Sequence, residues 1–145
     1  MKKIYLAGLI ATDYPESLEW RERAEDKLLH FDVLSPMRGK ANLQDESGDG
    51  GITSFTATSK DIILRDYNDV LAADIVLVNL NTFGCPRPLL GTIFELAWVW
   101  QLRKRCIAIC DKGNYLMHEH PFLKETISHY FETLEAACRF IRDQQ

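Results

Sequence analysis

The sequence predicts a doubly wound α/β fold, with a parallel sheet of about five strands and helices on both of its faces. Two observations carry this prediction. Short apolar runs that resemble buried strands alternate along the chain with longer amphipathic segments of helical periodicity. No two apolar runs are joined by a tight hairpin, so the connections have to be crossovers between parallel strands. The strand order 2-1-3-4-5 is a common arrangement for such a chain.

Composition and charge set the outer limits. The 145 residues are 46% hydrophobic and 26% charged, which is typical of one globular domain over residues 1–145. The net charge of −4 offers no basic surface for a nucleic-acid polymer. The apolar run at the N-terminus is too short for a signal peptide or a membrane span, so we expect a cytoplasmic protein without membrane contact.

The first part of the chain supplies two predicted strands and a helix. Residues 4–7 form an apolar run closed by Gly8, as in a central strand. Over 16–30, apolar positions at four-residue spacing among charged residues predict an amphipathic helix. A second, shorter strand over 31–34 ends before Pro36, because the residue before a proline avoids the helical region.

Residues 37–58 form one long irregular segment rich in glycine and acidic residues. Such a segment is either a lid over a ligand site or a disordered insertion, and the sequence leaves both open. Ser59 then caps a predicted helix over 59–73. The predicted buried stripe of that helix consists of Ile63, Tyr67, Val70 and Leu71. Asp66 falls on another face, where a carboxylate is ordinarily solvated.

The second part of the chain supplies three more strands and two helices. The run over 74–80 is β-branched and apolar, which predicts a central strand. A turn-rich loop leads into a helix over 92–103, and a buried strand over 106–110 follows. Residues 127–131 predict a last short strand, and 133–142 predict a closing helix.

Two features argue against a metal or redox centre. The four cysteines include no C-x-x-C pair, so we expect reduced thiols packed in the core. The run His118-Glu119-His120 lacks the H-E-x-x-H spacing and precedes Pro121. We therefore expect no metal and no cofactor.

The predicted fold provides one place for a ligand. In open parallel sheets ligands bind beyond the carboxyl ends of the strands where the strand order reverses, here between the first and third strands. The loops at this crevice are 8–14 and 81–91, and we expect Tyr5 and Asn79 to end the strands beneath. Glu95 follows the second loop. The sequence contains no dinucleotide fingerprint, P-loop or serine-hydrolase elbow.

Glu95 has two interpretations. Thr92 and Glu95 fit a capping box, in which both side chains satisfy backbone N–H groups at a helix start and no chemistry is implied. The position of Glu95 at the predicted crevice instead favours a catalytic role. The residues alone leave both interpretations open.

Several segments together resemble the nucleoside 2-deoxyribosyltransferase family. They are residues 3–8, residues 65–76, Gly91-Thr92-x-x-Glu95-Leu96-Ala97, His120-Pro121-Phe122 and residues 133–137. The likeness spans nearly the whole chain and is carried by the order and spacing of these segments. The resemblance implies a flavodoxin-like fold and an enzyme that cleaves the N-glycosidic bond of a 2′-deoxynucleoside. It also implies transfer of the deoxyribosyl group to a free nucleobase through a covalent glutamyl intermediate.

The resemblance implies roles for single residues as well. Glu95 matches the glutamate that attacks the sugar carbon C1′, Asp66 the aspartate that positions the base or transfers its proton, and Tyr5 the tyrosine that holds the nucleophile. A helix N-terminus would keep Glu95 ionised. We expect further substrate contacts from Gly8, Ile10, Asn79, Arg87, Leu89, Gly91, Met117 and His120. The last two are included because members of the family complete the site across a subunit interface, which implies a homo-oligomer.

One position departs from the family pattern. Six residues before the nucleophile, transferases of the family usually carry Asp and the related nucleoside-monophosphate glycosidases often carry Ser, but here the residue is Leu89. Arg87 could contact a phosphate instead, although a loop arginine is commonly a surface residue. Two alternatives therefore stay open: a hydrolytic nucleoside or nucleoside 5′-monophosphate N-glycosidase, and a non-catalytic nucleotide-sensing domain.

Overall fold

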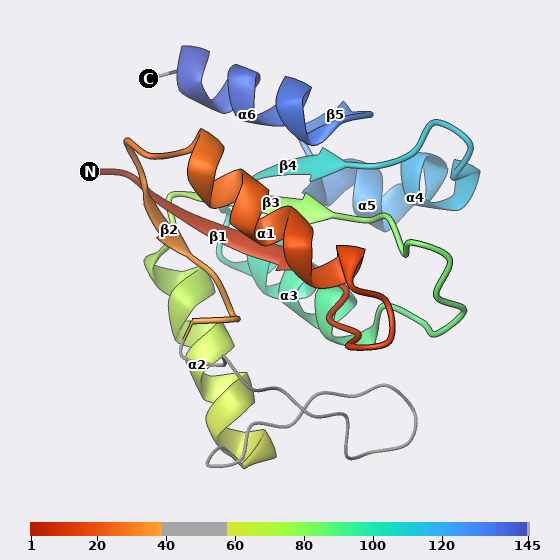
Figure 1. Ribbon diagram of the computed structural model, residues 1–145, viewed down its shortest axis with the longest axis horizontal. Helices are drawn as coiled ribbons and strands as arrows, with labels where there is room; N and C mark the ends of the chain where they lie inside the picture. The colour runs from red at the N-terminus through yellow and green to blue at the C-terminus, as the bar shows by residue number, and fades with distance from the viewer. Residues whose placement is uncertain (39–57, 145) are drawn as a thin grey trace.

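Five parallel strands form one sheet in the order β2-β1-β3-β4-β5, which confirms the predicted fold class and strand order (Figure 1). The computed structural model describes residues 1–38 and 58–144. The strands are β1 (Lys3–Gly8), β2 (Asp32–Leu34), β3 (Ile75–Asn79), β4 (Arg105–Ile109) and β5 (His129–Phe131). The order reverses between β1 and β3, because β2 lies on the other side of β1. The carboxyl ends of β1 and β3 therefore form the predicted crevice.

Helices connect and cover the strands. They are α1 (Glu16–Lys27), α2 (Ser59–Ala72), α3 (Leu90–Gln101), α4 (Tyr115–Glu119), α5 (Pro121–Thr126) and α6 (Leu134–Asp143). The four predicted helices are present with slightly shifted ends, whereas no pattern predicts α4 and α5, because such short segments show no helical period. Among the described residues, no helix is both long and apolar enough to cross a membrane. Residues 39–57 of the predicted lid lie outside the described residues.

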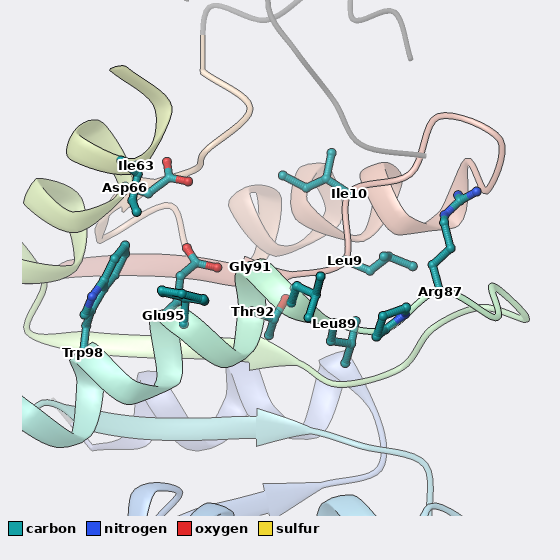
Figure 2. Close-up of a pocket in the computed structure, with 14 residues that line it drawn as sticks. Leu9, Ile10, Ile63, Asp66, Arg87, Leu89, Gly91, Thr92, Glu95 and Trp98 are labelled. Carbon is teal, nitrogen blue, oxygen red and sulfur yellow. The ribbon is translucent and has the colours of Figure 1, made fainter. Parts of the chain in front are cut away.

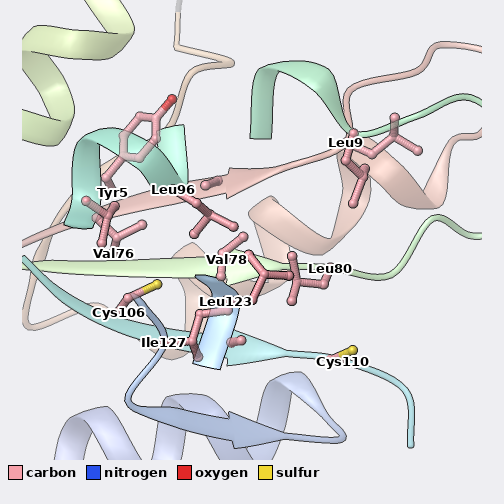
Figure 3. Packing of buried hydrophobic residues seen from close by; sticks show 14 of the residues in the cluster. Tyr5, Leu9, Val76, Val78, Leu80, Leu96, Cys106, Cys110, Leu123 and Ile127 are labelled. Carbon is pink, nitrogen blue, oxygen red and sulfur yellow. The ribbon is translucent and has the colours of Figure 1, made fainter. Parts of the chain in front are cut away.

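Both faces of the sheet are buried. Successive residues of a strand point to opposite faces, so each strand contributes to two cores. One core packs against α2, α3 and α5 and contains, from the central strands, Tyr5, Ala7, Val76, Val78, Cys106 and Ala108 (Figure 3). The other packs against α1 and α6 and contains Ile4, Leu6, Ile75, Leu77, Ile107 and Ile109. This double burial explains the continuous apolar runs. All four cysteines are buried and unbridged, as predicted.

Helix α2 begins with a capping box, one residue earlier than the predicted cap. The Thr58 hydroxyl accepts the Asp61 N–H, and the Asp61 carboxylate accepts the Thr58 N–H. The predicted buried stripe is partly wrong: Val70 is buried, but Ile63 and Leu71 are 45% and 47% exposed. Only the C-terminal part of α2 packs on the sheet, while the rest extends beyond it (Figure 1).

Helix α3 starts earlier than the sequence predicts. It begins at Leu90, and the Ile93 N–H donates to the Leu89 carbonyl at 2.9 Å. Leu89 is the N-cap, and no side chain caps this helix start. Thr92 is therefore inside the helix and Glu95 is in its second turn, so the predicted capping box is wrong. The expected support from the helix N-terminus is weak, because the dipole acts mainly on the first turn.

Candidate active site

A pocket of about 570 Å³ opens at the carboxyl ends of β1 and β3, at the predicted crevice (Figure 2). This volume suits a small-molecule site. The walls come from the loop after β1, from α2, and from the loop and first turns that begin α3. The lining residues are Gly8, Leu9, Ile10, Ile63, Asp66, Arg87, Pro88, Leu89, Leu90, Gly91, Thr92, Phe94, Glu95 and Trp98. Most of the predicted site residues are among them.

Tyr5 and Glu95 meet at the buried end of the pocket. The Tyr5 hydroxyl donates a hydrogen bond to Glu95 Oε2. Tyr5 is fully buried and Glu95 is 8% exposed. Burial raises the pKa of Tyr5 well above its usual value, and the negative charges of Glu95 and Asp66 raise it further. Tyr5 is thus a neutral donor that holds one carboxylate oxygen of Glu95.

The position of Tyr5 within its strand differs from the expectation. Tyr5 lies in the middle of β1, not at its end. It reaches Glu95 because strand alternation turns its ring to the side of the sheet that α3 covers. The contact therefore depends on the face of the strand that Tyr5 occupies, rather than on the strand end.

Asp66 reaches the same end of the pocket from α2. Its side chain is half-buried rather than fully solvated, and it lies beside Ile63 in the pocket wall (Figure 2). Its charge also acts on Tyr5, so the second carboxyl group is close to the Tyr5–Glu95 pair. We call the lining residues Asp66, Glu95 and Trp98, together with Tyr5 behind Glu95, the inner end of the pocket.

Trp98 forms an apolar wall of the inner end and is not among the predicted site residues. Its ring packs edge-on against Tyr67, with ring centroids 5.3 Å apart, and against Phe94, with centroids 6.5 Å apart. These contacts fix the indole beside Glu95 (Figure 2). Trp98 follows Glu95 by three residues in α3. Residues three apart lie on one face of a helix, so this spacing could have identified Trp98 from the sequence.

The loop after β1 is held by Arg21, a buried cation of α1 that is not among the predicted site residues. Arg21 is 1% exposed. Its guanidinium donates to the carbonyl oxygens of Gly8 at 2.8 Å, Leu9 at 3.3 Å and Ser17 at 2.8 Å. Burial lowers the pKa of Arg21 to about 10, while the ionisable groups of the inner end act in the opposite direction. Arg21 therefore fixes one pocket wall and offsets part of the negative charge of the inner end.

The two predicted glycines of the pocket differ in what they require. At Gly8, with φ of +156°, an added Cβ would lie 3.0 Å from the Asn79 carbonyl oxygen and 3.2 Å from the Trp20 ring. Only glycine allows this close approach. At Gly91, an added Cβ would meet nothing within 4 Å. Gly91 lines the pocket, but its position would accept a methyl group.

An ion pair joins two loops at the opposite end of the pocket. Arg87 donates to both carboxylate oxygens of Asp13, one from each terminal nitrogen. Its guanidinium also lies 5.7 Å from the centre of the Tyr14 ring. The hydrogen bond from Arg87 lowers the pKa of Asp13. Arg87 lies across the pocket from Asp66 and Trp98 (Figure 2). We call Asp13, Tyr14 and Arg87 the rim.

Three predicted substrate contacts do not line this pocket. The Asn79 side chain accepts the Asn81 N–H at 3.0 Å and so supports the loop after β3. Met117 lies in α4. His120 is the N-cap of α5, where its ring nitrogen accepts the Phe122 N–H at 3.2 Å. The structure of one chain therefore brings none of the three to the inner end.

The inner end combines two carboxyl groups, a neutral donor and an apolar wall. A carboxylate held in position can act as a nucleophile, and a second carboxyl group nearby can transfer a proton. Leu89 is 6% exposed and makes the wall between the inner end and the rim apolar. In residues 1–38 and 58–144, no group of three or more His, Cys, Asp or Glu side chains could hold a metal ion.

Comparisons with known proteins point to one family. A family model described as nucleoside 2-deoxyribosyltransferase matches residues 4–135. No curated protein matches the chain in sequence.

Three solved structures share the fold. A 2-deoxyribosyltransferase from Bacillus psychrosaccharolyticus is 22% identical, with a TM-score of 0.67 over 92% of this chain and 88% of that one. A 2-deoxyribosyltransferase from Leishmania mexicana is 19% identical, with a TM-score of 0.64 over 100% and 99% of the two chains. A CMP N-glycosidase from Clostridium botulinum is 13% identical, with a TM-score of 0.61 over 97% and 98%.

Proposed function

Because the chain belongs to the nucleoside 2-deoxyribosyltransferase family, we propose that it cleaves the N-glycosidic bond of 2′-deoxynucleosides and transfers the deoxyribosyl group to another nucleobase. Family membership supports an enzyme of the deoxyribosyltransferase or N-glycosidase type. One observation carries the finer proposal, namely the buried hydrogen bond from Tyr5 to Glu95 in a pocket that Asp66 also lines.

Glu95 is the nucleophile in this proposal. One of its carboxylate oxygens forms a bond to C1′ of the sugar while the C1′–N bond breaks, and the bonding electrons leave with the base. The sugar is positively charged in the transition state, so the carboxylate stabilises it before the new bond is complete. The product of this step is a deoxyribosyl ester of Glu95. Tyr5 positions the carboxylate, and its raised pKa keeps its hydroxyl protonated.

Asp66 moves the proton. The departing base needs a proton on one of its nitrogens, and Asp66, when protonated, donates it from the pocket wall. In the second half of the reaction a nitrogen of the incoming base attacks C1′, the ester bond breaks, and Asp66 takes up the proton that this base loses. Ile63 and Trp98 provide apolar surface for the faces of the base.

Substitution of Glu95 by Gln tests the nucleophile. The change keeps the size of the side chain but removes its charge, so base release should fall by about a thousandfold or more. The assay follows release of free base from each of the four common 2′-deoxynucleosides by chromatography. Glu19→Gln on the exposed side of α1 is the matched control. Full turnover in Glu95→Gln would refute the proposed nucleophile, and no release by the wild-type protein would favour a nucleotide-sensing domain.

The same assay separates transfer from hydrolysis. With a second base present, a transferase produces a new deoxynucleoside, whereas a hydrolase produces free deoxyribose. One of the similar structures is a CMP N-glycosidase, so hydrolysis is the alternative to transfer that the assay has to test. Free deoxyribose as the main product, at saturating acceptor base, would replace the proposed transferase with an N-glycosidase.

We also propose that copies of the chain assemble through α3 and α5. These two helices flank an apolar groove. The large apolar side chains that they expose, between 42% and 77%, are Leu90, Ile93, Phe94, Trp100 and Phe122. Exposed apolar patches of this kind favour a protein partner. His120 packs edge-on against Phe122, with ring centroids 5.5 Å apart, so a second copy on this face would bring His120 to the interface. Trp100→Glu should sediment as a monomer, and unchanged sedimentation would contradict this assembly.

A further inference from the structure

The rim lies where the 5′ group of the proposed substrate would reach. With C1′ at Glu95 and the base against Asp66 and Trp98, the sugar extends past Leu89 toward Arg87, at the opposite end of the pocket (Figure 2). This placement rests on the proposed function. The 5′ group is a hydroxyl in a nucleoside and a phosphate in a nucleotide, so the rim faces the atoms that distinguish these two substrate classes.

The Arg87 guanidinium is already paired with the carboxylate of Asp13. In the part of the chain that the structure describes, Arg87 is the one cationic residue that lines the pocket. Its two hydrogen bonds to Asp13 run from both terminal nitrogens to both carboxylate oxygens. Arginine uses this same parallel pair to bind phosphate. The Asp13 carboxylate therefore occupies the guanidinium edge that a 5′-phosphate would need.

We propose that Asp13 is a specificity residue that selects 2′-deoxynucleosides over their 5′-monophosphates. A phosphate at the rim either displaces Asp13, which forfeits the ion pair, or lies beside it, which brings two anions together. The carboxyl groups of Asp66 and Glu95 add to the cost, because they line the same pocket. A 5′-hydroxyl meets neither penalty and can donate a hydrogen bond to the Asp13 carboxylate.

Arg21, the buried cation near the pocket, does not change this preference for nucleosides over monophosphates. Arg21 is buried below the loop after β1 and directs its donors to backbone carbonyl oxygens. It contributes positive charge to the inner end, not a donor to the rim. Among the described residues, the pair of Asp13 and Arg87 is therefore the proposed determinant of selection at the 5′ position.

Binding to the Glu95→Gln variant tests the proposal, because this variant leaves the ligand intact. The probes are the four common 2′-deoxynucleosides, each compared with its own 5′-monophosphate by calorimetry. The parent should bind the nucleoside more tightly. Asp13→Asn should shift the ratio of the two Kd values toward the monophosphate by up to about fivefold, the size expected for one charge contact near a protein surface. The ratio of kcat/KM values in the otherwise wild-type chain is a second readout.

Two controls make the result specific. Adding Arg87→Ala should abolish the shift caused by Asp13→Asn, because the Arg87 guanidinium is the proposed phosphate ligand. Glu16→Gln removes an equal charge from the exposed start of α1 and should leave the ratio unchanged. An unchanged ratio in Asp13→Asn, or an equal shift in Glu16→Gln, overturns the proposal. If the Kd ratios change as expected but the wild-type protein releases no base, only the proposed reaction is overturned. If the chain binds neither nucleosides nor monophosphates, the proposed reaction and the proposed role of Asp13 are both overturned.

Discussion

The inner end and the rim of the pocket differ in what holds their side chains. The inner end is built on β1, α2 and α3, and its central hydrogen bond joins two buried residues, Tyr5 and Glu95. The rim is built on two loops, and the side chain of Asp13 is 51% exposed. A hydrogen bond to a carboxylate is strong where water is excluded, whereas an exposed ion pair contributes little and exchanges partners readily.

This difference suits two tasks. Bond cleavage needs groups that are already in position, which a buried contact between a strand and a helix provides. Discrimination between ligands needs a contact with which a group of the ligand can compete. An exposed ion pair between loop residues provides such a contact. Substitutions at the inner end should therefore act mainly on kcat, while substitutions at the rim should change which substrate is preferred.

Asp66→Asn should have the largest effect at the inner end after Glu95→Gln. Loss of the proton donor should slow base release by about a hundredfold, within the usual range for general acid catalysis. The loss should be much smaller with 7-methyl-2′-deoxyguanosine, whose base is already cationic and leaves without a proton. Steady-state kcat for deoxyguanosine and for its 7-methyl derivative gives the comparison. Equal losses on both substrates would mean that Asp66 positions the base and does not protonate it.

Tyr5→Phe should have a smaller effect on turnover. The change removes one hydrogen bond to the Glu95 carboxylate and keeps the ring, so kcat should fall by about tenfold, the size of one charge-assisted hydrogen bond. KM should stay near its original value, because Tyr5 itself does not line the pocket. If Tyr5→Phe changes KM and leaves kcat intact, Tyr5 does not position the Glu95 carboxylate for the reaction.

The same variant carries a pH test. The pKa of Tyr5 is raised in the folded chain, so above the unfolded value of about 10 the native state retains a proton that the unfolded state has lost. Stability should therefore fall with pH in this range, by up to about 1.4 kcal/mol per pH unit from this group. Urea unfolding of wild type and Tyr5→Phe between about pH 9 and pH 11 reports the contribution of Tyr5 together with its electrostatic coupling to Arg21, whose pKa of about 10 lies in the same range. Parallel curves would contradict the raised pKa of Tyr5.

The sequence predicts the inner end better than the rim, and the reason is physical. Continuous apolar runs mark the strands, the common strand order 2-1-3-4-5 arranges them, and the order reversal then places Glu95 at the crevice. The resemblance adds Asp66 and Tyr5. The pair of Asp13 and Arg87 joins residues 74 positions apart in two irregular loops, whose conformation no periodic pattern determines.

Local errors also have identifiable causes. Thr92 and Glu95 match the residue types of a capping box, but the helix already starts at Leu90, so the matching spacing falls inside the helix. Arginine is ordinarily solvated, yet Arg21 follows Ser17 by four residues and precedes Ala24 by three, which places it on the buried face of α1. In both cases residue type is misleading and position along the helix decides.

Gly91→Ala should have the smallest effect, and it probes the space between the two ends. Outside its chain neighbours and the backbone of its own helix, the added methyl group meets nothing within 4 Å, and alanine favours a helix over glycine, so the free energy of unfolding should rise by about 0.5–1 kcal/mol. If the sugar passes Gly91 on its way from Glu95 to the rim, the methyl group should raise KM and leave kcat unchanged, because the inner end is untouched. Urea unfolding and steady-state kinetics measure the two effects separately. A stabilised variant with an unchanged KM would show that the sugar takes another path, and the placement of the 5′ group at the rim would then fail with it.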